Sequence, residues 1–222
     1  ACRQPGRVRP QLDGLRLALQ DLGDPQRGSR SILVVGTNGK GSTVALLESL
    51  LREHGLATGR YTSPHLVRVE ERILIRGREI ASDELCRLLD LLEGHTDLTF
   101  FETLTAAAFL AFAESRLDCW VLEAGMGGGW DATRLAESAV AGLTNVGTDH
   151  RAWLGSDRKA IAADKGAALA AATAAVLGPQ VEPAILPFLR APGARPAPEL
   201  VSCRLLEHGT VEVAWDQHRV EV

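Results

Sequence analysis

A glycine-rich loop between a buried strand and a helix constrains the fold of this chain more than any other feature. Residues 32–51 read ILVVGTNGKGSTVALLESLL, an apolar run followed by a glycine-rich loop and a helical pattern. The apolar run is typical of a strand that is buried on both faces in a parallel sheet. Backbone N–H groups at the start of the following helix can bind phosphate, because the helix dipole favours negative charge there.

The spacing of this loop differs from that of the common P-loop. The common motif has a glycine five residues before its Gly-Lys pair and a Ser or Thr directly after the lysine. Here the first of these positions is a valine, and Gly41 separates Lys40 from Ser42. Lys40 could reach the outer phosphates of a nucleotide, and Ser42 or Thr43 could donate a hydroxyl to phosphate or magnesium. The alternative is a tight strand–helix turn with a solvent-facing lysine.

The rest of the chain alternates helical patterns with short apolar runs. This alternation predicts βαβ units and an α/β fold of three layers, in which a mostly parallel sheet is flanked by helices. Ligands bind to such sheets beyond the carboxyl ends of the strands. We expect helices at 11–22, 82–94, 99–115 and 160–175. Residues 58–63 predict a short strand and turn, and 118–125 and 139–150 each predict a strand that runs into a glycine-containing segment.

Residues that can carry chemistry fall at or just past the predicted strand ends. Glu123 ends an apolar run and precedes a glycine-rich segment, and a buried carboxylate is costly unless it meets a cation. His150 ends another run, where it is either structural or a neighbour of a metal. Magnesium prefers oxygen ligands, and the cysteines lack the spacing of a zinc site. The residues at these ends are Gly36, Ser63, Glu123 and His150.

Composition places the chain among ordinary globular proteins. Hydrophobic residues make up 45% and charged residues 23%, and the net charge of −4 gives no reason to expect nucleic-acid binding. The mixed charges of 68–79 predict a solvated strand pair. The apolar runs are far shorter than the roughly 20 residues that span a bilayer. Because Cys2, Cys86, Cys119 and Cys203 are scattered and no secretory signal is seen, we expect a cytoplasmic protein with free thiols.

The motifs, taken in order, resemble the folylpolyglutamate synthase and dihydrofolate synthase family of the Mur-ligase group, which are ATP-dependent amide-forming enzymes. The resemblance runs from about residue 11 to 190 and implies a P-loop NTPase-like fold of the Mur-ligase central-domain type. The glycine after Lys40 is the form of the loop found in this family. The segments that carry the resemblance are VVGTNGKGST (34–43), YTSPHL (61–66), TFFE (99–102), VLEAGMGGGWDAT (121–133), TNVGTDH (144–150) and IAADKG (161–166).

The resemblance implies an ATP site with two magnesium ions. Lys40 would bind the β- and γ-phosphates. Ser63 and Glu123 match ligands of the magnesium that bridges the phosphates, and Glu123 and His150 match ligands of a second one. Lys165 matches the lysine that the family carbamylates, which gives a carboxylate-like group near the second ion. The loop residues that would hold the phosphates are Gly36, Thr37, Asn38, Gly39, Lys40, Gly41, Ser42 and Thr43.

The implied activity is the addition of L-glutamate to dihydropteroate or a reduced folate through an acyl phosphate. Lys40, His150 and Lys165 would serve the reaction, and His65 and Asp131 would contact the pterin-bearing substrate. Phosphoryl transfer needs positioning and charge neutralisation and no nucleophilic side chain. A monomer without membrane or nucleic-acid partners is expected.

The resemblance also implies a domain organisation. Residues 1–190 would form the ATP-binding domain, and the Pro-rich segment and short strands of 191–222 would complete it. The family's C-terminal glutamate-binding domain is absent from these 222 residues.

Some positions depart from the family pattern. Gly129 stands where the family usually has Arg, Arg134 stands where it has Asn, and DKGAA (164–168) stands where it has EKAGI. These departures leave two alternatives open. The chain is either a non-catalytic homologue that binds a nucleotide or a partner protein, or a ligase that joins an amino acid to a carboxylate other than folate.

Overall fold

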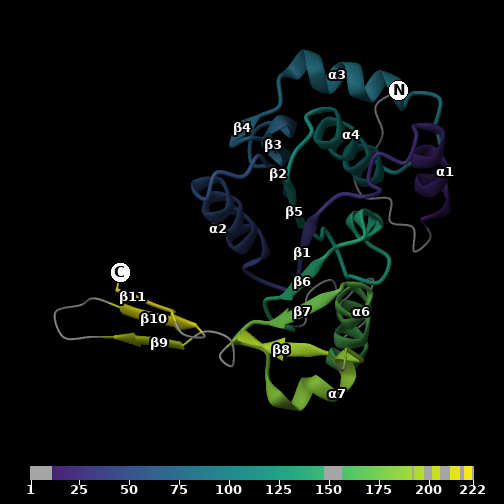
Figure 1. Ribbon diagram of the computed structural model, residues 1–222. Helices are drawn as coiled ribbons and strands as arrows, with labels where there is room; N and C mark the ends of the chain where they lie inside the picture. Colours follow the sequence, from purple (N-terminus) through teal and green to yellow (C-terminus); the bar gives the residue numbers. More distant parts are fainter. Residues whose placement is uncertain are drawn as a thin grey trace.

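The computed structural model describes residues 12–147, 157–191 and 193–197, together with the backbone of 202–205, 211–215 and 218–221. Helices and strands alternate along the chain (Figure 1). The helices are α1 (Asp13–Asp21), α2 (Lys40–Glu53), η1 (Val69–Arg72), α3 (Ser82–Leu91), α4 (Phe100–Glu114), η2 (Ala132–Ala136), α6 (Arg158–Ala171), η3 (Pro183–Ile185) and α7 (Leu186–Leu189). The strands are β1 (Ser31–Val35), β2 (Thr58–Tyr61), β3 (Ile73–Ile75), β4 (Arg78–Glu79), β5 (Cys119–Glu123), β6 (Val140–Leu143), β7 (Ala174–Leu177), β8 (Ala194–Pro196), β9 (Ser202–Leu205), β10 (Val211–Trp215) and β11 (His218–Glu221).

One sheet of eight strands forms the centre of the molecule. Its strand order is β4-β3-β2-β5-β1-β6-β7-β8. Neighbouring strands are parallel from β2 to β8 in this order, whereas β3 and β4 pair antiparallel. The predicted mostly parallel sheet is therefore confirmed. The second part of the mixed-charge segment 68–79 forms the expected strand pair, β3 and β4, whereas Val69–Arg72 form the 3₁₀ helix η1.

Helices cover both faces of this sheet, which gives the expected three layers (Figure 1). Helix α2 packs on one face, where Val44 meets Val34 of β1 and Val121 of β5. Helices α1, α4 and α6 pack on the other face, over the larger core. On that side the rings of Phe109 and Trp120 lie 5.7 Å apart.

The start of helix α4 is fixed by local hydrogen bonds. Thr99 accepts from the N–H of Glu102 at 3.2 Å, and the N–H of Thr99 donates to Glu102 Oε2 at 2.7 Å. This reciprocal capping box fixes the start of the helix. Most of its residues are buried, as an almost entirely apolar helix requires.

The end of one helix differs from the prediction. The helix expected at 160–175 ends at Ala171, and Ala174–Leu177 form β7 beside β6. Alanine favours a helix, so the alanines at the start of β7 continue the helical pattern past the end of α6. The Pro-rich loop also contains β8, an edge strand, where proline is tolerated because one side needs no N–H donor.

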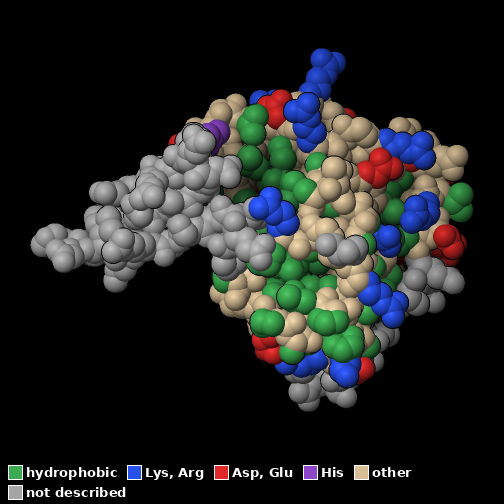
Figure 2. Space-filling view, turned by 60° about the horizontal axis from the view of Figure 1, so that its bottom comes forward, with side chains coloured by type: hydrophobic (Ala, Val, Ile, Leu, Met, Phe, Trp, Pro, Cys, Tyr) green, Lys and Arg blue, Asp and Glu red, His purple; other side chains and the backbone are tan. Residues whose placement is uncertain are grey.

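The short strands predicted near the C-terminus are present. β9, β10 and β11 form a second, antiparallel sheet of three strands, while β8 extends the main sheet. Figure 2 turns the bottom of Figure 1 towards the viewer and shows hydrophobic side chains in the hollowed middle of this face, with Lys and Arg side chains spaced around them. No helix in the described ranges has the length and apolar character needed to cross a membrane. Cys86 and Cys119 carry free thiols.

Candidate phosphate- and metal-binding site

The loop between β1 and α2 depends on its glycines. Gly36 has φ +148° and Gly39 has φ +78°, which side-chain-bearing residues rarely adopt. A Cβ on Gly36 would lie 1.9 Å from Thr144 Oγ1. The loop can therefore take this path only with glycine at 36.

The end of β6 holds the loop in place. The N–H of Thr37 donates to Asn145 O at 3.2 Å, and the N–H of Asn38 donates to Asn145 Oδ1 at 3.0 Å. Thr144 Oγ1 donates to Asn38 O at 2.7 Å, and the N–H of Gly147 donates to Thr37 Oγ1 at 2.8 Å. The sequence analysis gave Thr144 and Asn145 no role, although their place directly after an apolar run was a usable signal. These bonds leave the N–H groups of the first turn of α2 for a ligand, since they have no acceptor within the helix.

Lys40 is the first residue of α2, and its side chain folds back over the preceding loop. Its Nζ donates to Thr37 O at 3.1 Å, so the ammonium is held above the start of α2. Gly41, the next residue, lies beside the Glu123 carboxylate, because a Cβ on Gly41 would stand 3.3 Å from Glu123 Oε2. The first turn of α2 and this carboxylate therefore lie at the same end of the sheet.

Glu123 ends β5, between the ends of β1 and β2. Its Oε2 accepts the N–H of Ser63 at 3.1 Å and lies 3.3 Å from where a Cβ on Gly41 would stand. Burial raises the pKa of this carboxyl, more than the Ser63 N–H and the Lys40 charge lower it. The structure thus brings together three of the predicted strand-end positions and the phosphate loop.

These groups fit a magnesium ion that shares its coordination with phosphate. The described ranges contain no cluster of three or more His, Cys, Asp or Glu side chains able to hold a metal. Magnesium needs only one or two protein oxygen ligands, because water and phosphate fill the other positions. The Glu123 carboxylate and the Ser63 hydroxyl would supply that number. His150, predicted to serve a second ion, lies outside the described residues.

Lys165 is the most deeply buried cation of the described part of the chain. Its side chain on α6 is 1% exposed, and Nζ donates to Gly36 O at 2.9 Å. The pattern alone gave no reason to place this lysine at the loop. The structure places it directly behind the loop, on the side opposite α2.

His65 belongs to the turn that follows β2. Its Nδ1 accepts from Arg72 Nε at 2.9 Å, and the Arg72 guanidinium lies 5.4 Å from the centre of the Phe100 ring. Leu66 and Val67, beside it, are 92% and 84% exposed. An exposed apolar turn fixed by a buried arginine is compatible with a contact to an aromatic substrate.

Asp131 is buried, and its carboxylate oxygens accept hydrogen bonds from the glycine-rich segment that contains it. Oδ2 accepts the N–H of Met126 at 2.9 Å, and Oδ1 accepts the N–H of Thr133 at 3.0 Å and its hydroxyl at 2.6 Å. The side chain therefore shapes the segment 125–133, and any effect on a substrate passes through that segment.

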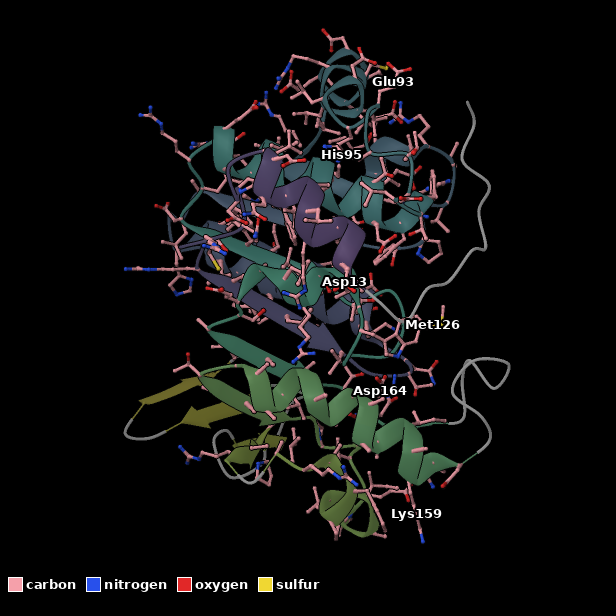
Figure 3. The ribbon with its side chains drawn as sticks, turned by 90° about the vertical axis from the view of Figure 1, so that its right-hand side faces the viewer. Asp13, Glu93, His95, Met126, Lys159 and Asp164 are labelled. Carbon is pink, nitrogen blue, oxygen red and sulfur yellow. The ribbon has the colours of Figure 1, made fainter. Side chains whose placement is uncertain are left out.

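The positions that depart from the family pattern contact one another. Asp164 Oδ1 accepts the N–H of Gly129 at 3.2 Å, and the Arg134 guanidinium donates to Gly129 O. Figure 3 shows Met126 and Asp164 at the same edge of the molecule, where the glycine-rich segment meets α6. The departures form a local set that anchors this segment.

Asp164 gives a testable pH dependence. Burial raises the pKa of its carboxyl, more than the Gly129 N–H and the Lys165 charge lower it. A raised pKa in the folded state contributes stability below the unfolded pKa of about 4, and this contribution is lost as the pH rises through the folded value. Compared with Asp164→Asn, the wild-type chain should therefore be relatively most stable near pH 4 and lose that advantage towards pH 8.

Thermal unfolding of both proteins across this range measures the effect. Asp90→Asn, on the exposed side of α3, is the matched control. A wild-type advantage that grows with pH would contradict the assignment.

Comparisons with known proteins give the family. Residues 34–173 match the Mur ligase middle domain. A probable bifunctional folylpolyglutamate synthase/dihydropteroate synthase of Haloferax volcanii is 40% identical over 179 residues, which cover 77% of this chain and 21% of the relative. A dihydrofolate synthase/folylpolyglutamate synthase of Buchnera aphidicola subsp. Schizaphis graminum is 38% identical over 173 residues, which cover 77% of this chain and 41% of the relative.

Solved structures agree with this assignment. E. coli FolC in complex with DHPP and ADP has a TM-score of 0.86 and 29% identity, over 98% of this chain and 54% of that one. The Yersinia pestis bifunctional folylpolyglutamate synthase/dihydrofolate synthase with AMPPNP and Mn ion has a TM-score of 0.82 and 31% identity, over 98% and 53%. The chain thus spans about half of these solved chains and less of the curated relatives. The match to the middle domain and the fold together show that this chain belongs to the Mur ligase middle-domain family.

Proposed function

We propose that this chain is the ATP-binding part of a ligase that adds L-glutamate to dihydropteroate or to a folate. The observation that carries the proposal is the meeting of Lys40, Ser63 and Glu123 at the glycine-rich loop. It is supported by the relatives, which are named as folylpolyglutamate and dihydrofolate synthases, and by solved structures with ADP, AMPPNP with Mn, DHPP or L-glutamate.

The described residues suit the first chemical step. A carboxylate oxygen of the substrate attacks the γ-phosphorus of ATP, the bond to the β-phosphate oxygen breaks, and ADP leaves. The first N–H groups of α2 would hold the phosphates, and Lys40 would balance the charge that shifts onto ADP. Magnesium held by Ser63 and Glu123 would supply further charge neutralisation.

The second step forms the amide. The α-amine of glutamate attacks the acyl carbon, phosphate leaves, and the amine gives up a proton. The chain needs only to hold the acyl phosphate in place and keep water away, so a nucleophilic side chain is not required. His65 and the segment shaped by Asp131 border the side where the pterin-bearing substrate would bind.

A second magnesium ion at Glu123 and His150, and a carbamate on Lys165, complete the proposal. The ammonium of Lys165 would first lose a proton, and the free amine would then add to CO₂ and release a second proton, so that a cation becomes an anion. A carbamate keeps one N–H, which can still donate to Gly36 O as Nζ does. With this bond kept, the carboxylate of the carbamate would approach the loop from the side opposite α2. A monomer in the cytoplasm, where ATP and folates are available, also belongs to the proposal.

The test measures phosphate release by the full-length gene product with ATP, magnesium and L-glutamate. We expect release that depends on all three and on either dihydropteroate or a reduced folate. Release with neither acceptor would remove the folate assignment. Release with another carboxylic acid would indicate the related ligase, and nucleotide binding without any turnover would indicate the non-catalytic homologue.

A further inference from the structure

Arg60 stands in the middle of β2, between two strands of the main sheet. Its Cα is paired with Val121 of β5 and Leu74 of β3. The residues on either side face α4, because a Cβ on Gly59 would meet Phe112 and the Tyr61 ring lies 5.9 Å from that of Phe101. Since side chains alternate along a strand, Arg60 points to the face covered by α2. That is the face on which α2 begins at the phosphate loop.

On this face Arg60 lines a pocket of ≈ 740 Å³. The pocket lies between the first turns of α2 and the β3–β4 hairpin, and Ser63 and Glu123 also line it. This volume is in the range of small-molecule sites, about 300–1,000 Å³. Arg60 Nε is buried and has no hydrogen-bond partner within the described ranges. A buried donor without a partner destabilises the fold, so the position of this guanidinium calls for a ligand.

Several of the other charged groups around the pocket have partners. Arg68 Nη2 lies 2.5 Å from Glu79 Oε2. Glu71 accepts the N–H groups of Leu66, Val67 and Arg68. The inner wall therefore presents the Arg60 guanidinium beside the Glu123 carboxylate, while the rim carries two arginines and two glutamates and so no net charge.

We propose that Arg60 binds a carboxylate of the substrate's glutamyl chain in this pocket, beside the phosphate loop. A planar guanidinium matches a carboxylate through two parallel N–H···O bonds. Under the proposed function, phosphate is bound by the loop at the other side of Gly41. The inference rests on the proposed function, because that function supplies a ligand with several carboxylates.

The experiment titrates γ-glutamylglutamate into the 222-residue chain and into three variants. Arg60→Met should weaken binding at least tenfold, and it should raise the unfolding temperature, because a buried unpaired donor is replaced by an apolar side chain of similar length. Arg60→Lys should also weaken binding, since lysine keeps the positive charge but cannot form the two parallel hydrogen bonds of a guanidinium. Arg76→Met is the control, because Arg76 donates to Ser115 O and does not line the pocket.

Several results would overturn this assignment. Equal affinities of wild type and Arg60→Met, or no binding by the wild type, would remove the carboxylate site. A lower unfolding temperature of Arg60→Met would show a structural role. Inorganic phosphate serves as the second probe, and Arg60-dependent binding of phosphate alone would assign a phosphate site in its place.

The two proposals can fail separately. If the chain binds an ATP analogue but its affinity for γ-glutamylglutamate does not depend on Arg60, only the assignment of the pocket is wrong. If γ-glutamylglutamate binds through Arg60 but the full-length gene product releases no phosphate with either acceptor, the proposed function is wrong and the carboxylate site stands.

Discussion

Lys40→Ala is expected to lower the affinity of the chain for a fluorescent ATP analogue by roughly 10- to 100-fold. Lys40 Nζ is held above the start of α2 by its bond to Thr37 O, where phosphate oxygens would lie. A hydrogen bond to a charged group contributes about 1.5–3 kcal/mol, and each 1.4 kcal/mol is about a factor of ten. The loop N–H groups would remain, so weak binding should persist at high ligand concentration.

Lys159→Ala is the matched control for this titration. Lys159 lies on α6 with its Nζ 4.9 Å from the centre of the Phe188 ring, and Figure 3 shows it at the far end of that helix. Its removal should leave the affinity unchanged. An unchanged affinity of Lys40→Ala would show instead that the loop is not a phosphate site.

Gly36→Ala is expected to destabilise the chain by about 2–6 kcal/mol. The substitution forces a side-chain-bearing residue to φ +148°, at a cost of about 1–3 kcal/mol. It also places a Cβ 1.9 Å from Thr144 Oγ1, and relieving this overlap costs about another 1–3 kcal/mol. Urea unfolding of the two proteins measures the difference.

Gly28→Ala separates the two causes. Gly28 has φ +71°, and a Cβ there would meet nothing within 4 Å. It should therefore cost only the backbone term, about 1–2 kcal/mol. Equal losses in Gly28→Ala and Gly36→Ala would contradict the close packing of the loop against β6.

The sequence predicted the parts of the fold that depend on short-range pattern. Buried apolar runs, a glycine loop and alternating helical patterns were enough to predict a parallel, three-layer arrangement. Ser63 and Glu123 could be placed together because parallel strands end at the same edge of a sheet. The end of α6 was predicted too late, because helix-favouring alanines continue into the strand β7 that follows.

The parts of the site that were missed depend on long-range packing. Arg60 gave no signal, because a lone arginine in a short strand is ordinary at a sheet edge, and the sequence does not show that β2 has neighbours on both sides. The hydrogen bonds of Asp131 to Met126 and Thr133 also gave no signal, and its expected contact with the substrate stays a prediction. The contact of Lys165 with the loop depends on how α6 crosses behind β1, which no local pattern encodes.

The central claim is that groups from separate strand ends act as one site for a magnesium-bound triphosphate. A double-mutant cycle of Lys40→Ala and Glu123→Gln tests it most directly, with the affinity for the ATP analogue measured in magnesium. If the two side chains act on one ligand and its metal, their effects should be coupled by at least about 0.5 kcal/mol. Losses that add up within about 0.3 kcal/mol would show two independent sites and contradict the account.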